Sequence, residues 1–418
     1  MAGRPRKTAG ESTSSLYEGS DGRWHARVTM GLKPDGRIER RHVSRATRPE
    51  LRAAVRELER GRDKGEHRWT EHDPTLGVWL EHWLTDIVPR TTRWKTQSTY
   101  NSQIRLHVLP TMSHIRLSEL QPENLEHLYG YLLDRDRSHH TVRAVHRVLR
   151  SCLNEAVRRR RMHLNPALVA RPPRHETNEV EPLTVSESQR LLAVAATRPN
   201  APRWSIALSL GLRQGEALGL MWSDLDLEDG TVRIRRAVQR WTWRHGCDLT
   251  EDGDHACGRK RGAECPDRTG GGLRLVETKT RASRRTVVLP APLVDELKAH
   301  RAAQARKRLE SGPAWDATHD MVFATKTGGL IDPCRDREVW LGILKEAGLR
   351  HVRVHDARHT AATLLLLQGV DIRTVMSIMG WTEMATAQRY THAVDELRRR
   401  AAQRIGDILW TDQPAQTR

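Results

Sequence analysis

Residues 211–218 read Gly-Leu-Arg-Gln-Gly-Glu-Ala-Leu, which places an arginine at the start of a short helix-forming run. Further segments follow in a fixed order: Thr278-Lys279-Thr280, His355-Asp356-Ala357-Arg358-His359-Thr360, Met379-Gly380-Trp381 and Tyr390-Thr391-His392. A His followed three residues later by Arg occurs about three times by chance in a chain of this composition, so that pair alone means little. The ordered set is not expected by chance, and it indicates one site built from distant segments.

The residue types in this set are suited to phosphoryl transfer. Arg213 and Arg358 are permanently charged planar donors, which can bind the two nonbridging oxygens of a phosphodiester and stabilise a pentacoordinate transition state. Two guanidinium groups make a metal ion unnecessary for this step. Tyr390 can act as a covalent nucleophile once its phenol loses the proton. The pattern therefore predicts transesterification through a phosphotyrosine, with no cofactor required for catalysis.

These segments closely resemble the tyrosine recombinase (phage integrase) family, and the run from Gly215 to Asp226 is similar to what integrases carry after their first arginine. The resemblance implies that Lys279 lies on a turn between two strands and protonates the leaving 5′ oxygen. It implies that His355 assists in proton transfer or hydrogen bonding. Trp381 stands where the family more often has His, and an indole can only donate a hydrogen bond.

Two carboxylates are candidates for a supporting role. Glu216 follows Arg213 by three residues and can orient that arginine. Asp356 can do the same near the His355/Arg358 pair, but a plain role at a helix amino terminus is an equally good interpretation.

Composition points to a polyanionic partner. The 418 residues include 70 Lys and Arg against 52 Asp and Glu, which gives a net charge of +18. The plainer alternative is that the arginine content reflects a GC-rich genome and that the excess charge keeps the protein soluble.

Residues 1–15 are basic but lack an apolar stretch, so we expect neither a secretory signal nor a membrane anchor. Five cysteines are too few for a disulfide scaffold. A cytoplasmic location is the expectation.

The first part of the chain predicts a flexible basic arm and a small sheet domain. The arm covers residues 1–15, and the domain covers residues 16–68. Apolar and polar residues alternate between Trp24 and Met30, which predicts a strand, and a basic second strand follows a turn. A helix is expected from about Thr47 to Arg62. The resemblance implies that this domain binds arm-type DNA sites.

Residues 73–171 have helical periodicity, with expected breaks at Pro110 and around residues 136–138. This block resembles the SAM-like core-binding bundle of integrases. Some of its basic residues are candidate phosphate ligands, although each alone fits a solvated charge: Arg93, Lys95, Arg105 and Arg143. The proline-rich stretch 172–182 is predicted to be a linker.

The remainder is predicted to be a helix-rich α+β catalytic domain, residues 183–410, with an insert at 238–272 and a tail at 411–418. Strands are expected near residues 231–236, 273–277 and 285–289. The insert lacks apolar periodicity but contains candidate zinc ligands: His245, Cys247, His255, Cys257 and Cys265. Because no Cys-x-x-Cys pair is present, an exposed unliganded loop is the default expectation, and structural zinc is the alternative.

The sequence thus predicts a multidomain protein: a small α+β amino-terminal sheet domain, an all-α SAM-like core-binding bundle and a mixed, helix-rich α+β tyrosine recombinase catalytic domain. The expected activity is site-specific recombination at DNA attachment sites, for integration or excision of a mobile element. The resemblance implies a homotetramer on double-stranded DNA, with a directionality factor and a host DNA-bending protein as candidate partners. A type IB topoisomerase-like enzyme and a catalytically silent DNA-binding regulator are the alternatives.

Overall fold

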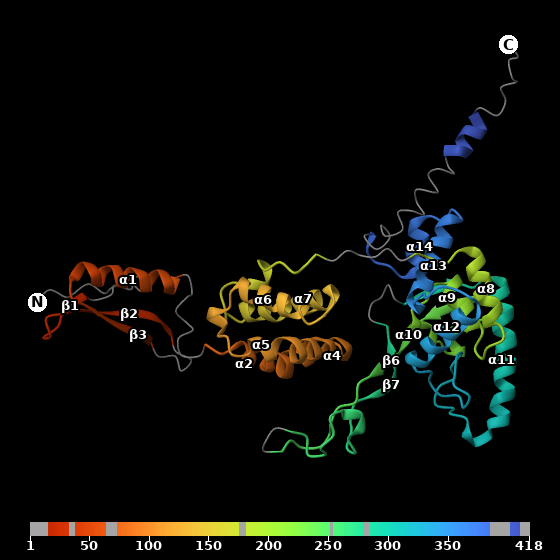
Figure 1. The fold of residues 1–418 in the computed structure, drawn as a ribbon, viewed down its shortest axis with the longest axis horizontal. Coiled ribbons are helices and arrows are strands. Elements are labelled where there is room, and N and C mark those ends of the chain that lie inside the picture. Colours follow the sequence, from red (N-terminus) through yellow and green to blue (C-terminus); the bar gives the residue numbers. More distant parts are fainter. Residues whose placement is uncertain are drawn as a thin grey trace, which may run out of the picture. The chain divides into compact units, whose positions relative to one another are not determined.

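The computed structural model describes residues 16–32, 38–63, 73–174, 181–250, 254–278, 284–384 and 402–409 (Figure 1). The chain divides into two compact units, residues 1–177 and 178–418. The first unit contains the sheet domain and the helical domain, and the second contains the predicted catalytic domain. No helix in the described ranges has both the length and the apolar character needed to cross a membrane.

The amino-terminal domain is an antiparallel sheet packed on a helix. Its strands are β1 (Leu16–Glu18), β2 (Trp24–Leu32) and β3 (Ile38–Arg45), in the order β1-β2-β3. Helix α1 (Arg48–Asp63) packs against them. Ala26 and Val28 alternate with polar residues on β2, and they form a small core with Leu51 and Val55 of α1. The alternation read from the sequence therefore corresponds to one buried sheet face.

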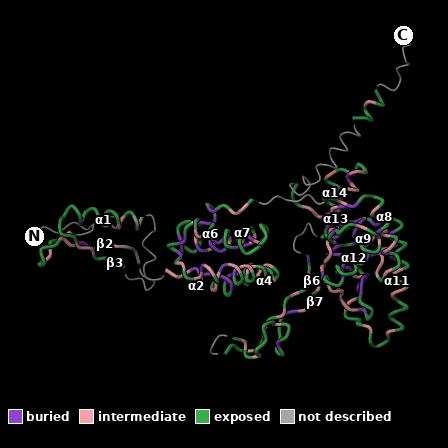
Figure 2. The backbone as a smooth tube through the Cα atoms, in the orientation of Figure 1, coloured by how far each residue is buried: buried purple, intermediate pink, exposed green. Residues whose placement is uncertain are grey.

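The second domain is all helical and surrounds one core, which Figure 2 shows as a buried interior. Two of its helices contain a π-helical turn. The bounds are α2 (Leu76–His82), a π turn (Trp83–Ile87), α3 (Val88–Thr91), α4 (Trp94–Gln103), a π turn (Ile104–Val108), α5 (Leu109–Met112), α6 (Pro122–Leu133) and α7 (His139–Arg158).

The predicted break at Pro110 is wrong, because the helix continues through it. Proline lacks the backbone N–H and its ring crowds the preceding turn, which normally ends a helix. Here the N–H of Leu109 bonds to the carbonyl of Ile104, and this wider π turn precedes the proline. The same arrangement precedes Pro89, where Val88 bonds to Trp83. A π turn before each proline allows the helix to continue at the cost of a local bulge.

The catalytic unit combines helices with small sheets. Strands β4 (Leu225–Asp226), β5 (Thr231–Ile234) and β8 (Arg285–Val288) form one antiparallel sheet. Strands β6 (Arg236–Trp241) and β7 (Gly272–Glu277) form a separate ribbon. The helices are α8 (Val185–Ala195), α9 (Pro202–Ser209), α10 (Gln214–Leu218), α11 (Ala291–Ser311), α12 (Pro333–Glu346), α13 (Val354–Leu367) and α14 (Ile372–Met379), and residues 402–409 are also helical.

The predicted strand at 231–236 is in fact two strands that join different sheets. It divides after Ile234, and β6 continues to Trp241, within the segment that the sequence assigned to the insert. Arg236 pairs with Glu277 and Trp241 pairs with Gly272 along the β6–β7 ladder. The insert is therefore a loop held at the end of a paired ribbon, which the sequence alone did not indicate.

A buried ion pair connects two helices of the catalytic unit. Arg203 of α9 donates to Asp336 of α12 at 3.0 Å, and both side chains are almost fully enclosed. Gln214, the first residue of α10, donates to the same carboxylate at 2.9 Å. Asp336 thus connects three helices, and it fixes the start of α10 next to Arg213.

Removal of Asp336 should leave the Arg203 guanidinium buried without its charged partner. We expect Asp336→Ala to lower the free energy of unfolding by about 3–5 kcal/mol. The free energy of unfolding should fall less in the double variant Arg203→Met/Asp336→Leu, since this variant leaves no buried charge. Chemical denaturation monitors both. The exposed neighbouring pair Arg335–Glu338 provides the control, because Arg335→Ala should leave the unfolding midpoint unchanged. A double variant that is less stable than Asp336→Ala would contradict this account.

Candidate active site

The loop that carries Arg213 depends on a glycine. Gly211 has a φ of +58°, and a Cβ at this position would lie 2.7 Å from the Sδ of Met379 and 3.2 Å from the Cβ of Ala361. A larger residue would therefore be strained and would also clash. The close approach brings the loop against α13, which carries His355 and Arg358, and against α14, which Trp381 follows.

Arg213 is the amino-terminal cap residue of α10, and glycines hold this helix against β6. A Cβ on Gly215 would lie 2.8 Å from the carbonyl oxygen of Val238, and one on Gly219 would lie 2.8 Å from the Cα of Ala237. The two glycines are four residues apart and lie on one helix face. Consequently α10 packs backbone to backbone on the β6 ribbon, and this contact positions Arg213.

Glu216 lies beneath Arg213 and binds two arginines. Its carboxylate is 2.7 Å from Nη1 of Arg213 and 3.1 Å from Nη2 of Arg285. Burial alone would raise the pKa of Glu216, but Arg285 and Arg213 outweigh that effect and hold the pKa below its usual value. The glutamate side chain is only 4% exposed, whereas Arg213 is 42% exposed. The ion pair therefore anchors Arg213 and leaves part of its guanidinium accessible.

Arg358 brings three of the segments together. It lies on α13 and is buried, with Nη1 donating to the carbonyl of Gly211 at 2.7 Å. Its Nη2 donates to the carbonyl of Met379. The guanidinium carbon is 5.7 Å from the centre of the Trp381 ring, within cation–π distance. Arg213, Arg358 and Trp381 thus belong to one neighbourhood.

His355 lies in the first turn of α13, and its electrostatic surroundings are positive. Partial desolvation lowers its pKa, and the charges of His359, Arg358 and Arg213 lower it further, while Asp356 acts in the opposite sense. The imidazole ring meets His359 edge to face at 5.6 Å between centroids. A neutral imidazole is therefore favoured at physiological pH.

Asp356 has the helix-terminal role that the sequence left open. Its carboxylate accepts from the backbone N–H of Arg353 at 2.9 Å and forms an ion pair with the Arg353 side chain at 2.8 Å. This is a capping arrangement at the start of α13. Asp356 thus supports the turn that carries His355.

Lys279 and Tyr390 lie outside the described residues. The structure does describe the ends of the strands on either side of the lysine segment, β7 at Glu277 and β8 from Arg285. Beside them is a hollow of about 560 Å³ with a strongly basic lining, which includes Arg233, Arg235, Arg236, Arg284 and Arg285. Such a lining suits a phosphate backbone.

Arg285 is a supporting residue that the sequence did not reveal. Besides Glu216, it donates from Nε to the carbonyl of Ile378 at 2.7 Å, which connects β8 to α14. Its position directly after Arg284, near the lysine segment, was the only available signal. A charge pattern alone does not tell which arginine turns inward.

The candidate phosphate ligands of the helical domain are all exposed: Arg93, Lys95, Arg105 and Arg143. Arg105 forms an ion pair with Glu81 at 2.7 Å, so part of its charge is already compensated. Arg147 and Arg150, which the sequence reading omitted, are also exposed and continue the Arg143 stripe along α7. Helical spacing could have identified them.

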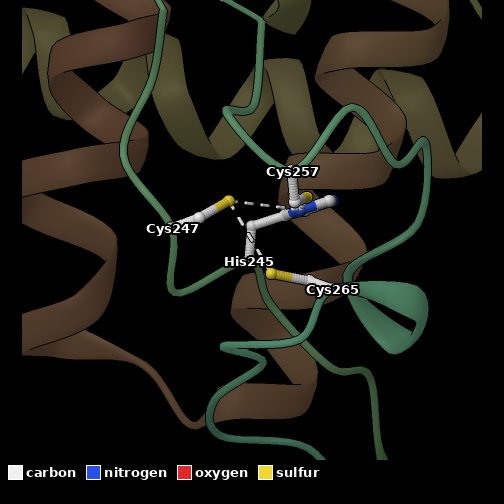
Figure 3. Close-up of side chains that lie close together, drawn as sticks. All are labelled: His245, Cys247, Cys257 and Cys265. Carbon is white, nitrogen blue, oxygen red and sulfur yellow. Dashed lines mark hydrogen bonds between the residues drawn. The ribbon is translucent and has the colours of Figure 1, made fainter.

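In the insert, four of the five predicted metal-ligand candidates converge: His245, Cys247, Cys257 and Cys265 (Figure 3). Burial raises the pKa of the Cys265 thiol, but N–H groups including those of Gly246 and Asp267 donate to its sulfur and bring the pKa to about 7. His255 is not a member of the four-residue group. Its ring instead stacks on His245, with centroids 3.6 Å apart. The described part of the insert is mainly exposed, as the default expectation has it, but four of its candidate ligands lie close together.

Two arginines, a histidine and an indole lie together near a basic hollow, and these residue types are suited to phosphoryl transfer on a polyanion. Residues 268–396 match the phage integrase family, and residues 75–133 match the SAM-like N-terminal domain of phage integrases. An integrase of Saccharopolyspora erythraea is 41% identical, over 97% of this chain and 98% of that protein. The chain therefore belongs to the phage integrase family, and it is a tyrosine-type site-specific recombinase.

Other comparisons agree with membership of the phage integrase family. A XerC-like tyrosine recombinase of Caldanaerobacter subterraneus is 26% identical over 91% of this chain and 95% of that protein. The Tn1549 transposon integrase, solved with transposon right end DNA, has a TM-score of 0.60 at 16% identity, covering 79% of this chain and 99% of that one. A lambda integrase tetramer bound to a Holliday junction has a TM-score of 0.52 at 14% identity, covering 90% and 94%. The solved structures show a shared fold.

The lowered pKa of His355 gives a test in solution. Because the imidazole stays neutral until the pH falls below its usual pKa, the rate of DNA cleavage by the wild type should decline only below about pH 6.5. His355→Gln should be slower at neutral pH, by about 10²-fold, and should lack this decline. Single-turnover rates from pH 5 to 8 provide the measurement. His351→Gln, an exposed histidine just before α13, should behave as wild type. If His355→Gln shows the same decline in rate at low pH, His355 is not the group whose protonation causes it.

Proposed function

We propose that this recombinase cuts and rejoins DNA at defined attachment sites through a 3′ phosphotyrosine intermediate on Tyr390, and that it integrates or excises a mobile element. The observation that carries the proposal is the convergence of Arg213, Arg358, Trp381 and His355 around the Gly211 loop. Similarity to an integrase over nearly the whole chain favours recombination over a topoisomerase or a silent regulator.

The proposed chemistry is a balanced transesterification. The Tyr390 phenol gives up its proton to neutral His355, and its oxygen bonds to phosphorus as the bond from phosphorus to the 5′ oxygen breaks. Lys279 supplies the proton to that leaving oxygen. Arg213 and Arg358 stabilise the charge on the nonbridging oxygens. Attack by a 5′ hydroxyl of another strand reverses the step, so no nucleotide is consumed.

The supporting residues account for the rigidity of the site. Glu216 holds Arg213 from below at 2.7 Å, and the hydrogen bonds of Arg358 to two backbone carbonyls fix its plane. Preorganised donors of this kind need no reorganisation when charge develops. His355, held neutral by its partial burial and by its cationic neighbours, accepts or passes on a proton. Trp381 donates a hydrogen bond and packs against its neighbours.

We assign the DNA-binding roles by domain. Residues 16–68 would bind arm-type sites, preceded by the basic arm at 1–15. Residues 73–171 would hold the core site through basic positions such as Arg143, and the linker 172–182 would join them to the catalytic domain at 183–410. Four protomers would act on two duplexes in the cytoplasm, assisted by a directionality factor and a host DNA-bending protein. The exposed arginines of α7 and the basic hollow beside β7 and β8 support the DNA contacts.

The reaction as proposed needs no cofactor, since two guanidinium groups take the place of a metal. We assign metal binding only a structural role, in the insert.

The nucleophile can be tested with a nicked suicide substrate that carries a candidate attachment site. Without added metal ions, the wild type should form a covalent protein–DNA adduct on a denaturing gel, and Tyr390→Phe should form none, because phenylalanine has no oxygen to attack phosphorus. Tyr131→Phe, which alters a surface tyrosine of the helical domain, should retain the adduct. An adduct in Tyr390→Phe would refute the assignment.

A further inference from the structure

The strongest unexplained feature is the cluster in the insert. One histidine nitrogen and three sulfur atoms, from His245, Cys247, Cys257 and Cys265, all lie within 4.8 Å of one another. Figure 3 shows these side chains pointing toward a common centre from separate turns of the loop. Because the four residues span twenty-one positions of the chain, their convergence reflects how the loop folds and not sequence proximity.

Three of the six distances between these atoms are near the edges of a metal-centred tetrahedron, and the others are no longer than 4.8 Å. Metal–ligand bonds of about 2.0–2.3 Å around zinc require edges of about 3.5 Å between nitrogen and sulfur and about 3.8 Å between two sulfurs. The measured separations are 3.3 Å from His245 Nδ1 to Cys257 Sγ, 4.0 Å from His245 Nδ1 to Cys247 Sγ, and 3.7 Å from Cys247 Sγ to Cys265 Sγ. A disulfide would require about 2.0 Å between sulfurs, and all the cysteines are free.

Apart from the cluster, the described part of the insert has few buried contacts, chiefly those of the Trp243 ring with Arg268 and with the backbone at Gly271. In the described stretches 242–250 and 254–270, Cys265 is the one buried residue, and Leu249 is exposed. Figure 2 shows the segment beyond β6 and β7 as mainly exposed or intermediate. Yet the loop is ordered, with isolated bridges between Arg244 and Thr269 and between Leu249 and His255. A fold without an apolar core needs a crosslink, and a bound metal supplies one.

Neighbouring residues shape the cluster without belonging to it. Gly246 lies between two candidate ligands, and a Cβ there would come within 1.9 Å of the Asp267 carbonyl oxygen. This close approach brings the His245 and Cys247 segment against the Cys265 segment. The His255 ring is nearly parallel to that of His245, with 5° between the planes, which fixes the orientation of the His245 ring.

We propose that the insert is a zinc module in which His245, Cys247, Cys257 and Cys265 are the ligands and His255 is not. Three thiolates and one imidazole in a closed tetrahedral set favour zinc in a structural role, since no position remains for water or substrate. The module is attached to the active-site unit through β6, on which α10 packs with Arg213 at its start. The metal therefore stabilises the insert and the ribbon that supports this helix.

Metal content tests the proposal independently of DNA cleavage. Full-length protein, purified without a polyhistidine tag under reducing conditions, should contain one zinc ion per chain by atomic emission. Cys247→Ser and Cys257→Ser should each contain at least about fivefold less, because a lost thiolate weakens binding strongly. Cobalt(II) added to the metal-free wild type should give thiolate-to-metal charge-transfer bands with the visible bands of tetrahedral cobalt, and this signal should be lost in Cys257→Ser.

Two control variants make the ligand assignment specific. Cys334→Ser removes an exposed cysteine of α12 and should leave zinc content unchanged. His255→Phe keeps an aromatic ring for stacking but removes the nitrogen atoms, and it should also retain zinc. Wild-type protein without zinc and without a cobalt signal would overturn the proposal, as would a Cys247–Cys265 disulfide in a peptide map of the reduced preparation. Loss of zinc in His255→Phe to the level of Cys257→Ser would overturn the ligand set.

Discussion

The hydrogen bonds of Arg358 to the carbonyls of Gly211 and Met379 are the interaction on which the active site depends. They connect the loop before α10, the helix α13 and the end of α14, which are far apart in the sequence. A buried guanidinium must have its donors satisfied, and these backbone carbonyls satisfy two of them in a fixed geometry. The arginine to which we assign transition-state stabilisation is therefore also the one that connects the surrounding segments.

Close backbone packing and buried charge complete the arrangement. Gly211, Gly215 and Gly219 let the Arg213 loop and α10 approach α14 and β6 more closely than any side chain would permit. Glu216 compensates Arg213 and Arg285 within a site that otherwise concentrates positive charge. Without the Glu216 carboxylate, the guanidinium groups of Arg213 and Arg285 would repel each other, at the place where Arg213 is proposed to face the substrate.

Strand β6 connects the active site to the insert. One face of this strand supports α10, while its ladder with β7 carries the Cys/His cluster at the far end. The ribbon continues through β7 to Glu277, just before the lysine segment. The proposed metal module is therefore joined by one hydrogen-bonded ladder to the strand on which α10 packs and to the strand that leads to the lysine segment.

Local pattern was informative where one residue type or one period decided the structure. Alternation predicted the strand at β2, and helical periodicity predicted the bundle, because burial of one face has a fixed spacing. Local pattern did not predict the structure where that structure depended on contacts with other segments of the chain. The helix through Pro110 needed a π turn, β6 needed β7, and His255 was displaced from the cluster by stacking on His245.

The sequence by itself determined the family, the order of the catalytic residue types and the cationic character of the chain, since these depend on residue identity and spacing alone. Only the tertiary structure decided that Glu216 binds Arg285 as well as Arg213, that Asp356 caps a helix, and which four insert residues converge. The Asp356 cap is a local contact with Arg353, for which the sequence had left two roles open. The Glu216–Arg285 contact and the insert cluster join segments that are apart in the chain, and their geometry is set by packing, which no local pattern encodes.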